Sequence, residues 1–134
     1  MPVRGIGIDV CKVERIAESL QRFGVRMERR LFTPGELAYC RGFKDPLPHL
    51  AARFAAKEAA SKALGTGIAG GIGWTQIEVV QPGGRVPLLR LSGAALERFH
   101  AMGATRSFLT LSHDGGLGVA CVVLEKRCRA CNAC

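Results

Sequence analysis

The alternation of hydrophobic and polar positions predicts a strand followed by an amphipathic helix at the start of the chain. Residues 3 to 9 form a short apolar run that ends in Asp9. From Cys11 to Phe23 the apolar side chains fall at i, i+3, i+4 and i+7, the spacing of one helix face, while the opposite face is charged. Gly24 stands where such a helix is expected to end.

The segment that follows carries the signature of a helix start. Thr33 is a suitable N-cap, Pro34 suits the first helical position, and Glu36 completes a capping box. We therefore expect a short helix that runs to about Arg41.

An alanine-rich stretch from about Leu50 to Leu64 predicts a third helix, with Gly65 as its left-handed C-cap. The glycine-rich residues 66 to 73 have neither a Gly-x-Gly-x-x-Gly pattern nor a Gly-Lys-Ser/Thr ending, so no nucleotide-binding fingerprint is met. We expect a flexible connector there, with the edge of a ligand site as the alternative.

The second half of the chain alternates as strands do. Residues 75 to 80 and 86 to 91 are rich in β-branched and apolar side chains and flank a Pro-Gly-Gly turn, which predicts a hairpin. Residues 107 to 113 and 118 to 125 flank an Asp-Gly-Gly turn and predict a second hairpin.

Ser92 is expected to cap one more helix, from Gly93 to Met102. Together these elements predict an α+β fold in which an antiparallel sheet packs against helices. We expect one domain over residues 1 to 126 and a short cysteine-containing tail over 127 to 134.

The helix over residues 53 to 65 contains the candidate chemistry. Its i, i+4 spacing places Glu58 beside Lys62, which is the arrangement of an ordinary surface ion pair and also one that can hold a metal ion and a phosphate together. Asp9 ends the first strand, so two carboxylates from distant segments can meet at one site. That convergence favours the metal-binding interpretation.

The charge balance favours a polyanionic partner. The chain has 19 Lys and Arg against 11 Asp and Glu, a net charge of +8. Nucleic acid, an acidic protein and a phosphorylated small molecule all fit, but only 6% of the residues are aromatic and no basic stripe with stacking aromatics is present, so nucleic acid is not expected. No apolar run is long enough for a membrane span and the start lacks a secretory segment, so we expect a cytoplasmic protein without a membrane partner.

The six cysteines fall into two groups. Cys11, Cys40 and Cys121 have apolar neighbours and are expected to be buried free thiols of a reducing compartment. Cys128, Cys131 and Cys134 have spacings suited to zinc or iron, yet a closed structural site needs four ligands, so a frayed terminus is the simpler interpretation.

The sequence also resembles a known family, the holo-acyl-carrier-protein synthases, which are short 4'-phosphopantetheinyl transferases. The resemblance covers residues 3 to about 125 and keeps the family's order and spacing. It rests on the following segments: Gly5-Ile-Gly7-Ile-Asp9, Phe32-Thr33-x-x-Glu36-Leu37, Arg53-Phe54-Ala-x-Lys57-Glu58-Ala-x-x-Lys62-Ala-x-Gly65-Thr-Gly67-Ile, Gly71-Ile72-x-Trp74-x-x-Ile77-Glu78-Val79, Leu111-Ser112-His113 and Ala120-x-Val122-Val123.

The resemblance implies transfer of the 4'-phosphopantetheine arm of coenzyme A to a serine of apo acyl carrier protein, with release of adenosine 3',5'-bisphosphate. It implies Mg2+ as the cofactor and Asp9 and Glu58 as its ligands, which agrees with the preference of Mg2+ for carboxylate and phosphate oxygens. Lys62 is expected to neutralise or protonate the departing phosphate. Either Glu58 or a metal-bound water takes the serine proton, and the sequence leaves both open.

The family resemblance also implies the ligand and partner contacts. Arg53, Lys57 and His113 are expected to contact the phosphates of coenzyme A, with a structural or solvated role as the alternative for Lys57 and a hydrogen-bonded structural role for His113. Arg15 and Arg22, and less firmly Arg26, are expected to dock the acidic helix of the carrier protein.

A homotrimer with active sites between subunits is likewise implied by the resemblance, with the hairpin around Gly83 to Pro87 reaching the coenzyme A of a neighbour. One departure from the family is Asp114, which places a negative charge beside His113 where many relatives have threonine or serine. Arg85 is a candidate to offset that charge, and a simple turn role for Asp114 is the alternative.

Two rival functions remain open at this stage. A basic module that binds nucleic acid or an acidic protein would not need the carboxylates, and a magnesium-dependent hydrolase of diphosphate compounds would use Asp9 and Glu58 equally well. The sequence does not indicate whether the carrier belongs to fatty acid or polyketide synthesis.

Overall fold

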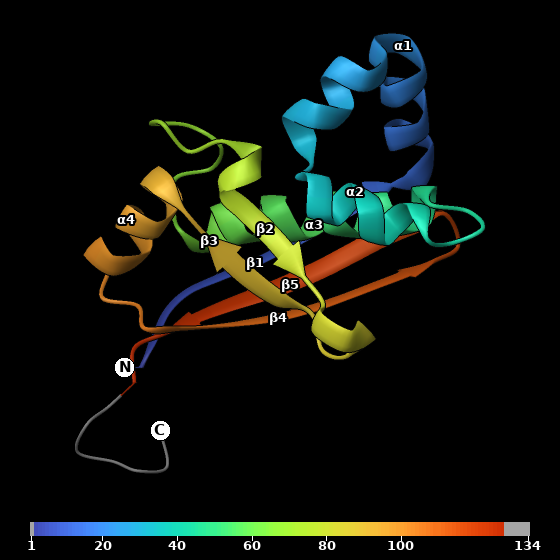
Figure 1. Cartoon of the computed structure of the whole chain (residues 1–134). Coiled ribbons are helices and arrows are strands. Elements are labelled where there is room, and N and C mark those ends of the chain that lie inside the picture. Colours follow the sequence, from blue (N-terminus) through green and yellow to red (C-terminus); the bar gives the residue numbers. More distant parts are fainter. Residues whose placement is uncertain (1, 128–134) are drawn as a thin grey trace.

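Figure 1 shows a helical layer that covers one face of an antiparallel sheet in this computed structural model, which describes residues 2 to 127. The α+β prediction is confirmed. The elements follow in the order β1 (Val3–Lys12), α1 (Val13–Leu31), α2 (Pro34–Arg41), α3 (Leu47–Ala63), β2 (Ile77–Val80), β3 (Leu88–Leu91), α4 (Gly93–Ala101), β4 (Arg106–Asp114) and β5 (Leu117–Glu125).

The main sheet has the strand order β1-β5-β4, and both pairings are antiparallel. The hairpin of β2 and β3 forms a second sheet, and its turn projects beyond the main sheet (Figure 1). Helix α3 lies along one face of the main sheet and is buried over most of its length. The fold therefore places α3, with its candidate residues, between the sheet and the other helices.

Close approach of α3 to the sheet explains the glycines of β1. A Cβ atom on Gly7 would lie 1.9 Å from the carbonyl oxygen of Ala59, and one on Gly5 would lie 2.0 Å from that of Ala63. Neither position can therefore carry a side chain, and because side chains alternate along a strand, the residues between them point to the other face of the sheet. Asp9 lies two residues beyond Gly7 and therefore faces α3.

The capping predictions are confirmed in detail for α2. The backbone N–H of Thr33 donates to Glu36 Oε1 at 2.9 Å, and the N–H of Glu36 donates to Thr33 Oγ1 at 3.2 Å. Gly65 follows α3 with φ of 78°, as expected of a left-handed C-cap. Both hairpins are confirmed as well.

Several boundaries differ from the prediction, and among them β3 begins at Leu88 rather than at Val86. Gly24 breaks the helical geometry of α1 (φ 64°, ψ −147°), but a further helical segment continues to Leu31, because a glycine of positive φ can redirect a chain as well as end a helix. Helix α3 begins at Leu47 rather than Leu50, since proline is tolerated in the first turn. Strand β1 runs on to Lys12, and β2 begins at Ile77 after a short 3-10 turn.

The predicted cap of α4 is not formed by the side chain of Ser92. Ser92 is the N-cap residue but its side chain makes no capping hydrogen bond, and Gln76 Oε1 accepts from the backbone N–H of Ala95 instead. A side chain brought in by the packing of the preceding turn thus replaces the local cap.

Cys11, Cys40 and Cys121 are free thiols, the first two buried and the third half-buried. The tail predicted for residues 127 to 134, including Cys128, Cys131 and Cys134, lies outside the described residues except for Arg127. No helix in the described part of the chain has the length and apolar content that a membrane crossing requires.

Candidate active site

Asp9 and two residues of α3 converge at the edge of the sheet, as the sequence predicts. Lys62 Nζ donates to Asp9 Oδ1 at 2.8 Å and to the carbonyl oxygen of Ile8 at 3.1 Å. Lys62 therefore pairs with Asp9, and in the described structure it forms no ion pair with Glu58. The long lysine side chain reaches across to the neighbouring strand rather than along its own helix.

The half-buried Glu58 carboxyl lies within reach of the charges of Asp9 and Lys62. Burial raises the pKa of Glu58 above its usual value, and the negative charge of Asp9 raises it further, while Lys62 and Arg15 act in the opposite direction. The hydrogen bond that Lys62 donates to Asp9 raises the pKa of Lys62. Asp9 and Glu58 thus act on each other as like charges, and Arg15 borders the same site.

The donor set fits a hard divalent cation. Two carboxylates that repel each other gain from a cation between them, and Mg2+ takes one or two protein carboxylates with phosphate oxygens and water for the rest. Among residues 2 to 127, no third histidine, cysteine, aspartate or glutamate joins a metal-binding group. The remaining ligands must therefore come from a substrate or from water.

Arg53 lies one and a half turns before Glu58 on α3 and is almost completely buried. Its Nη2 donates to Gln81 Oε1 at 3.1 Å, and its guanidinium lies 4.1 Å from the ring centre of Tyr39. Its Nε has no hydrogen-bond partner although it is buried. A buried guanidinium with an unused donor is a candidate anion contact.

His113 lies near a second histidine that the sequence analysis did not single out. The rings of His113 and His49 are in edge contact with centroids 4.8 Å apart, and His49 stacks on Phe43 at 3.6 Å. The sequence gives no signal for His49 beyond its place at the start of a predicted helix, because its contacts come from distant residues.

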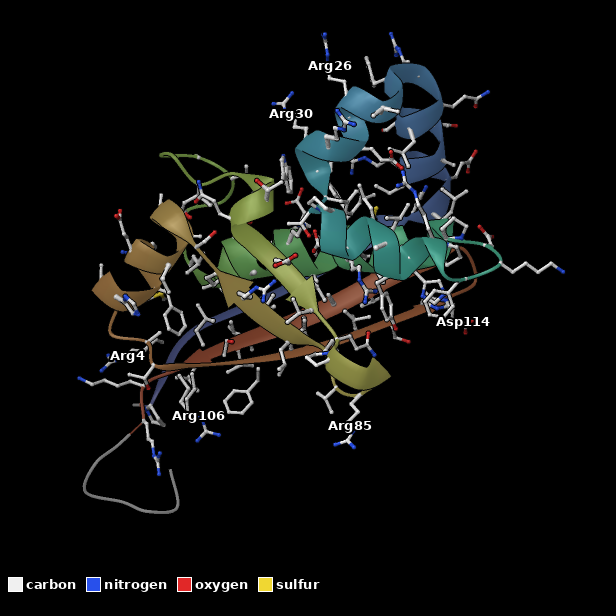
Figure 2. All side chains as sticks on the ribbon, in the orientation of Figure 1. Arg4, Arg26, Arg30, Arg85, Arg106 and Asp114 are labelled. Carbon is white, nitrogen blue, oxygen red and sulfur yellow. The ribbon has the colours of Figure 1, made fainter. Side chains whose placement is uncertain are left out.

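Asp114 lies at the β4–β5 turn, next to His113 in the sequence. Arg85 lies on the β2–β3 turn, and Figure 2 shows the two well separated. Arg85 of the same chain therefore does not offset the charge of Asp114, and the turn role remains for that residue.

Lys57 lies in the interior, away from the Asp9 edge. Its side chain is 0% exposed and its ammonium group contacts Glu36 Oε1 at 2.6 Å. It also donates to the carbonyl oxygens of Trp74 at 3.0 Å and Ile77 at 2.9 Å. All three of its donors are used, so the structure favours the structural role over the expected phosphate contact.

The exposed surface of α1 carries the predicted partner residues. Arg15 and Arg22 are both exposed, and the guanidinium of Arg22 lies 5.2 Å from the ring centre of Phe23. Arg26 and Arg30 point away from the body of the molecule (Figure 2). This helix therefore presents a basic surface with one exposed aromatic ring.

Comparisons with known proteins show the family of the chain. Residues 5 to 115 match the 4'-phosphopantetheinyl transferase superfamily. The chain is 46% identical over 124 residues to the holo-[acyl-carrier-protein] synthase of Koribacter versatilis, covering 92% of this chain and 98% of that protein.

Solved structures are similar as well. The crystal structure of holo-[acyl-carrier-protein] synthase from Neisseria meningitidis has a TM-score of 0.82 and 35% identity, covering 92% of this chain and 99% of the other. The Helicobacter pylori enzyme in complex with coenzyme A has a TM-score of 0.79 and 32% identity, covering 90% and 99%.

Proposed function

Because this chain belongs to the 4'-phosphopantetheinyl transferase superfamily, we propose that it carries out the reaction of its holo-[acyl-carrier-protein] synthase relatives. It transfers the 4'-phosphopantetheine group of coenzyme A to a serine of apo acyl carrier protein. The products are holo acyl carrier protein and adenosine 3',5'-bisphosphate. The convergence of Asp9, Glu58 and Lys62 at one edge of the sheet carries this proposal.

The reaction joins the serine oxygen to the phosphorus that carries the pantetheine arm and breaks the bond from that phosphorus to the bisphosphate. Asp9 and Glu58 are the residues that would hold Mg2+, which supplies charge neutralisation of the diphosphate when bound. The two carboxylates lie on α3 and on the strand against it, so the protein positions the site with rigid elements.

Lys62 is placed to stabilise the leaving phosphate. Its ammonium group sits beside Asp9, is half-exposed and is long enough to turn toward a bound diphosphate. The serine proton passes to Glu58 or to a water at the same site.

The phosphates of coenzyme A are assigned to Arg53 on α3 and to His113, which lies on the face of the sheet that α3 covers. His113 pairs with Gly118 in the β4–β5 register, and Gly118 packs directly against α3. Lys57 has a structural role: it stabilises the packing of α3 through its ion pair with Glu36 and its hydrogen bonds to the carbonyl oxygens of residues 74 and 77.

Docking of the acidic carrier protein is assigned to Arg15 and Arg22 on α1. Both are exposed, Arg15 borders Glu58, and the protein has a net charge of +8. We place the enzyme in the cytoplasm, in agreement with its three described free thiols, where it serves fatty acid or polyketide synthesis.

A homotrimer is supported by the open face of the main sheet. The residues that alternate with Gly5, Gly7 and Asp9 point away from α3, and they include Ile6 and Ile8, which are 66% and 61% exposed. Val10 and Phe108 add to the same apolar face. An apolar patch of this kind marks an interface.

Sedimentation equilibrium is expected to give about three times the mass of the 14.3 kDa chain. Ile8→Asp would put a charge on the apolar face and shift the protein toward monomer. A wild-type enzyme that is active only as a monomer would contradict the proposed assembly.

Incubation with coenzyme A, Mg2+ and an apo acyl carrier protein, followed by intact-mass analysis, tests the function. Addition of the phosphopantetheinyl mass to the carrier is expected, and the rate should fall steeply with added salt because carrier docking is electrostatic. Cleavage of coenzyme A without modification of the carrier would instead indicate a hydrolase. Binding without any reaction would indicate a non-enzymatic basic module.

A further inference from the structure

We propose that Gln81 is a positioning residue for the transfer reaction, which holds the turn between β2 and β3 where it meets coenzyme A bound to a neighbouring chain. The inference rests on the proposed function and the proposed homotrimer, and it extends them because it names the group that fixes the turn. Gln81 is assigned no contact with the substrate. Its effect passes through residues 82 to 87, the turn that follows it in the sequence.

The turn needs an anchor beyond its own hairpin. Strands β2 and β3 have four residues each and form a two-stranded sheet, which is marginally stable by itself. The turn projects beyond the main sheet (Figure 1), and Val86 beside it is 67% exposed. Gly83 and Gly84 have φ of 63° and 67°, a conformation that glycine adopts without cost but that it is also free to leave.

The side chain of Gln81 supplies this anchor. Its Nε2 donates to the carbonyl oxygen of Arg85 at 2.6 Å and so spans the turn. Its Oε1 accepts from Arg53 Nη2 at 3.1 Å. Arg53 is 1% exposed and its guanidinium lies 4.1 Å from the ring centre of Tyr39, so this end of the link is fixed in the interior. One amide therefore ties an exposed turn to the buried side of α3.

The amide group suits both of its neighbours. Arg53 presents N–H donors and Arg85 presents a carbonyl acceptor, and glutamine offers an oxygen to the first and an N–H to the second. Glutamate at position 81 would keep the acceptor and lose the donor, and leucine would lose both. The bond to the turn can therefore be removed with or without the bond to Arg53.

The turn carries a hollow that suits a ligand. Its volume is about 480 Å³, within the range of small-molecule sites. It combines apolar surface with one cation and is lined by Pro82, Gly83, Arg85, Val86 and Leu88. A loose turn would lose the shape of this hollow and the direction of the cation.

The turn cannot serve the Asp9 site of its own chain. Strand β3 packs beside β4, whereas Asp9 lies on β1 at the opposite edge of the β1-β5-β4 sheet. Arg85 points away from the body of the molecule (Figure 2). Coenzyme A bound at one Asp9 site therefore meets the turn of another chain in the homotrimer.

Steady-state kinetics with an apo carrier protein test the role of Gln81. Gln81→Leu is expected to raise KM for coenzyme A about tenfold through the loss of both hydrogen bonds, with kcat within about twofold of the wild type because the carboxylate site is intact. Gln81→Glu should raise KM by a similar factor, since it also loses the bond to the turn. Unchanged KM in either variant, or a fall in kcat alone, would overturn the proposal.

Gln76→Leu is the matched control. Gln76 lies before β2, and its side chain also joins two backbone groups, the carbonyl oxygen of Gly71 and the N–H of Ala95. Its replacement is expected to lower Tm and to leave KM for coenzyme A unchanged. An equal rise of KM in Gln76→Leu and Gln81→Leu would reduce Gln81 to a structural role and overturn the proposal.

Mixed trimers show which chain the turn serves. Gln81→Leu and Glu58→Gln chains are co-expressed with different tags and purified through both tags. At coenzyme A concentrations well below the wild-type KM, they should reach about one third of the wild-type rate, because a cyclic mixed trimer contains one site with an intact Glu58 and an intact neighbouring turn. A rate below that of the Gln81→Leu enzyme would place the turn at the site of its own chain and overturn the proposal. A wild-type enzyme that fails to modify the carrier would instead overturn the proposed function, so the two failures are distinguishable.

Discussion

Replacement of Glu58 by glutamine is expected to lower kcat for phosphopantetheinyl transfer by about 10²–10⁴-fold, the usual contribution of a general base. The amide removes one metal-ligand charge and cannot accept the serine proton, while the shape of the side chain is retained. The rate is measured as the mass gain of an apo carrier protein at saturating coenzyme A and Mg2+. Turnover within about threefold of the wild type would remove Glu58 from the mechanism.

The pH dependence gives this prediction a second readout. The pKa of Glu58 is raised in the metal-free protein, and Mg2+ held by its carboxylate would lower it, so the acid limb of the wild-type rate should move to lower pH as the Mg2+ concentration rises. The glutamine variant should lack this acid limb.

Stability must move in the opposite direction to activity. Because the folded pKa of Glu58 is raised, the folded protein binds more protons than the unfolded chain in that window, and stability is lost as pH rises through the folded pKa. At pH 7 the metal-free Glu58→Gln protein is therefore expected to melt at or above the wild-type temperature. A Tm of the Glu58→Gln protein below that of the wild type would indicate that the activity is lost through unfolding.

The second large effect concerns the buried ion pair of α2 and α3. Lys57→Met is expected to lower the free energy of unfolding by about 3–5 kcal/mol, because it leaves Glu36 charged and unpaired in the interior. Glu36 would keep only its bonds from the backbone N–H groups of Thr33 and Val79. Urea unfolding at a fixed protomer concentration measures the change, since assembly also contributes to stability.

Two comparison variants separate the buried charge from packing. Glu36→Gln combined with Lys57→Met removes both charges and is expected to recover at least half of the loss, since the amide can still bond to the surrounding backbone. Arg41→Met breaks the surface pair with Glu28 and should cost less than about 1 kcal/mol. Equal losses for Lys57→Met and Arg41→Met would contradict the buried-pair interpretation.

Several features of this fold follow from residues that are neighbours in the sequence. The capping box of Thr33 and Glu36, the C-cap at Gly65 and both hairpins were predicted, because each depends on hydrogen bonds or backbone angles set within a few residues. The meeting of Asp9 with Glu58 at one site was also predicted, but the hydrogen bond of Lys62 to Asp9 was not. That prediction came from the position of Asp9 at a strand end and of Glu58 on a helix, and the family resemblance supported it.

Other features depended on contacts that no local pattern encodes. Lys57 looks like any helical lysine in the sequence, yet it is fully buried because Glu36 and two carbonyl groups of a later turn surround it. His49 acquires its setting only when Phe43 and His113 pack against it. The continuation of α1 beyond Gly24 likewise depends on where the redirected chain can pack.

The sequence alone therefore determined the elements, the α+β class and the residue types of the Asp9 and Glu58 site. The tertiary structure decided which buried charged groups keep an unused donor and which are satisfied internally: Arg53 Nε has no partner, whereas all three donors of Lys57 are used. The physical reason is that periodicity and capping are short-range properties of the backbone, whereas the desolvation and pairing of a charge depend on every segment that packs around it.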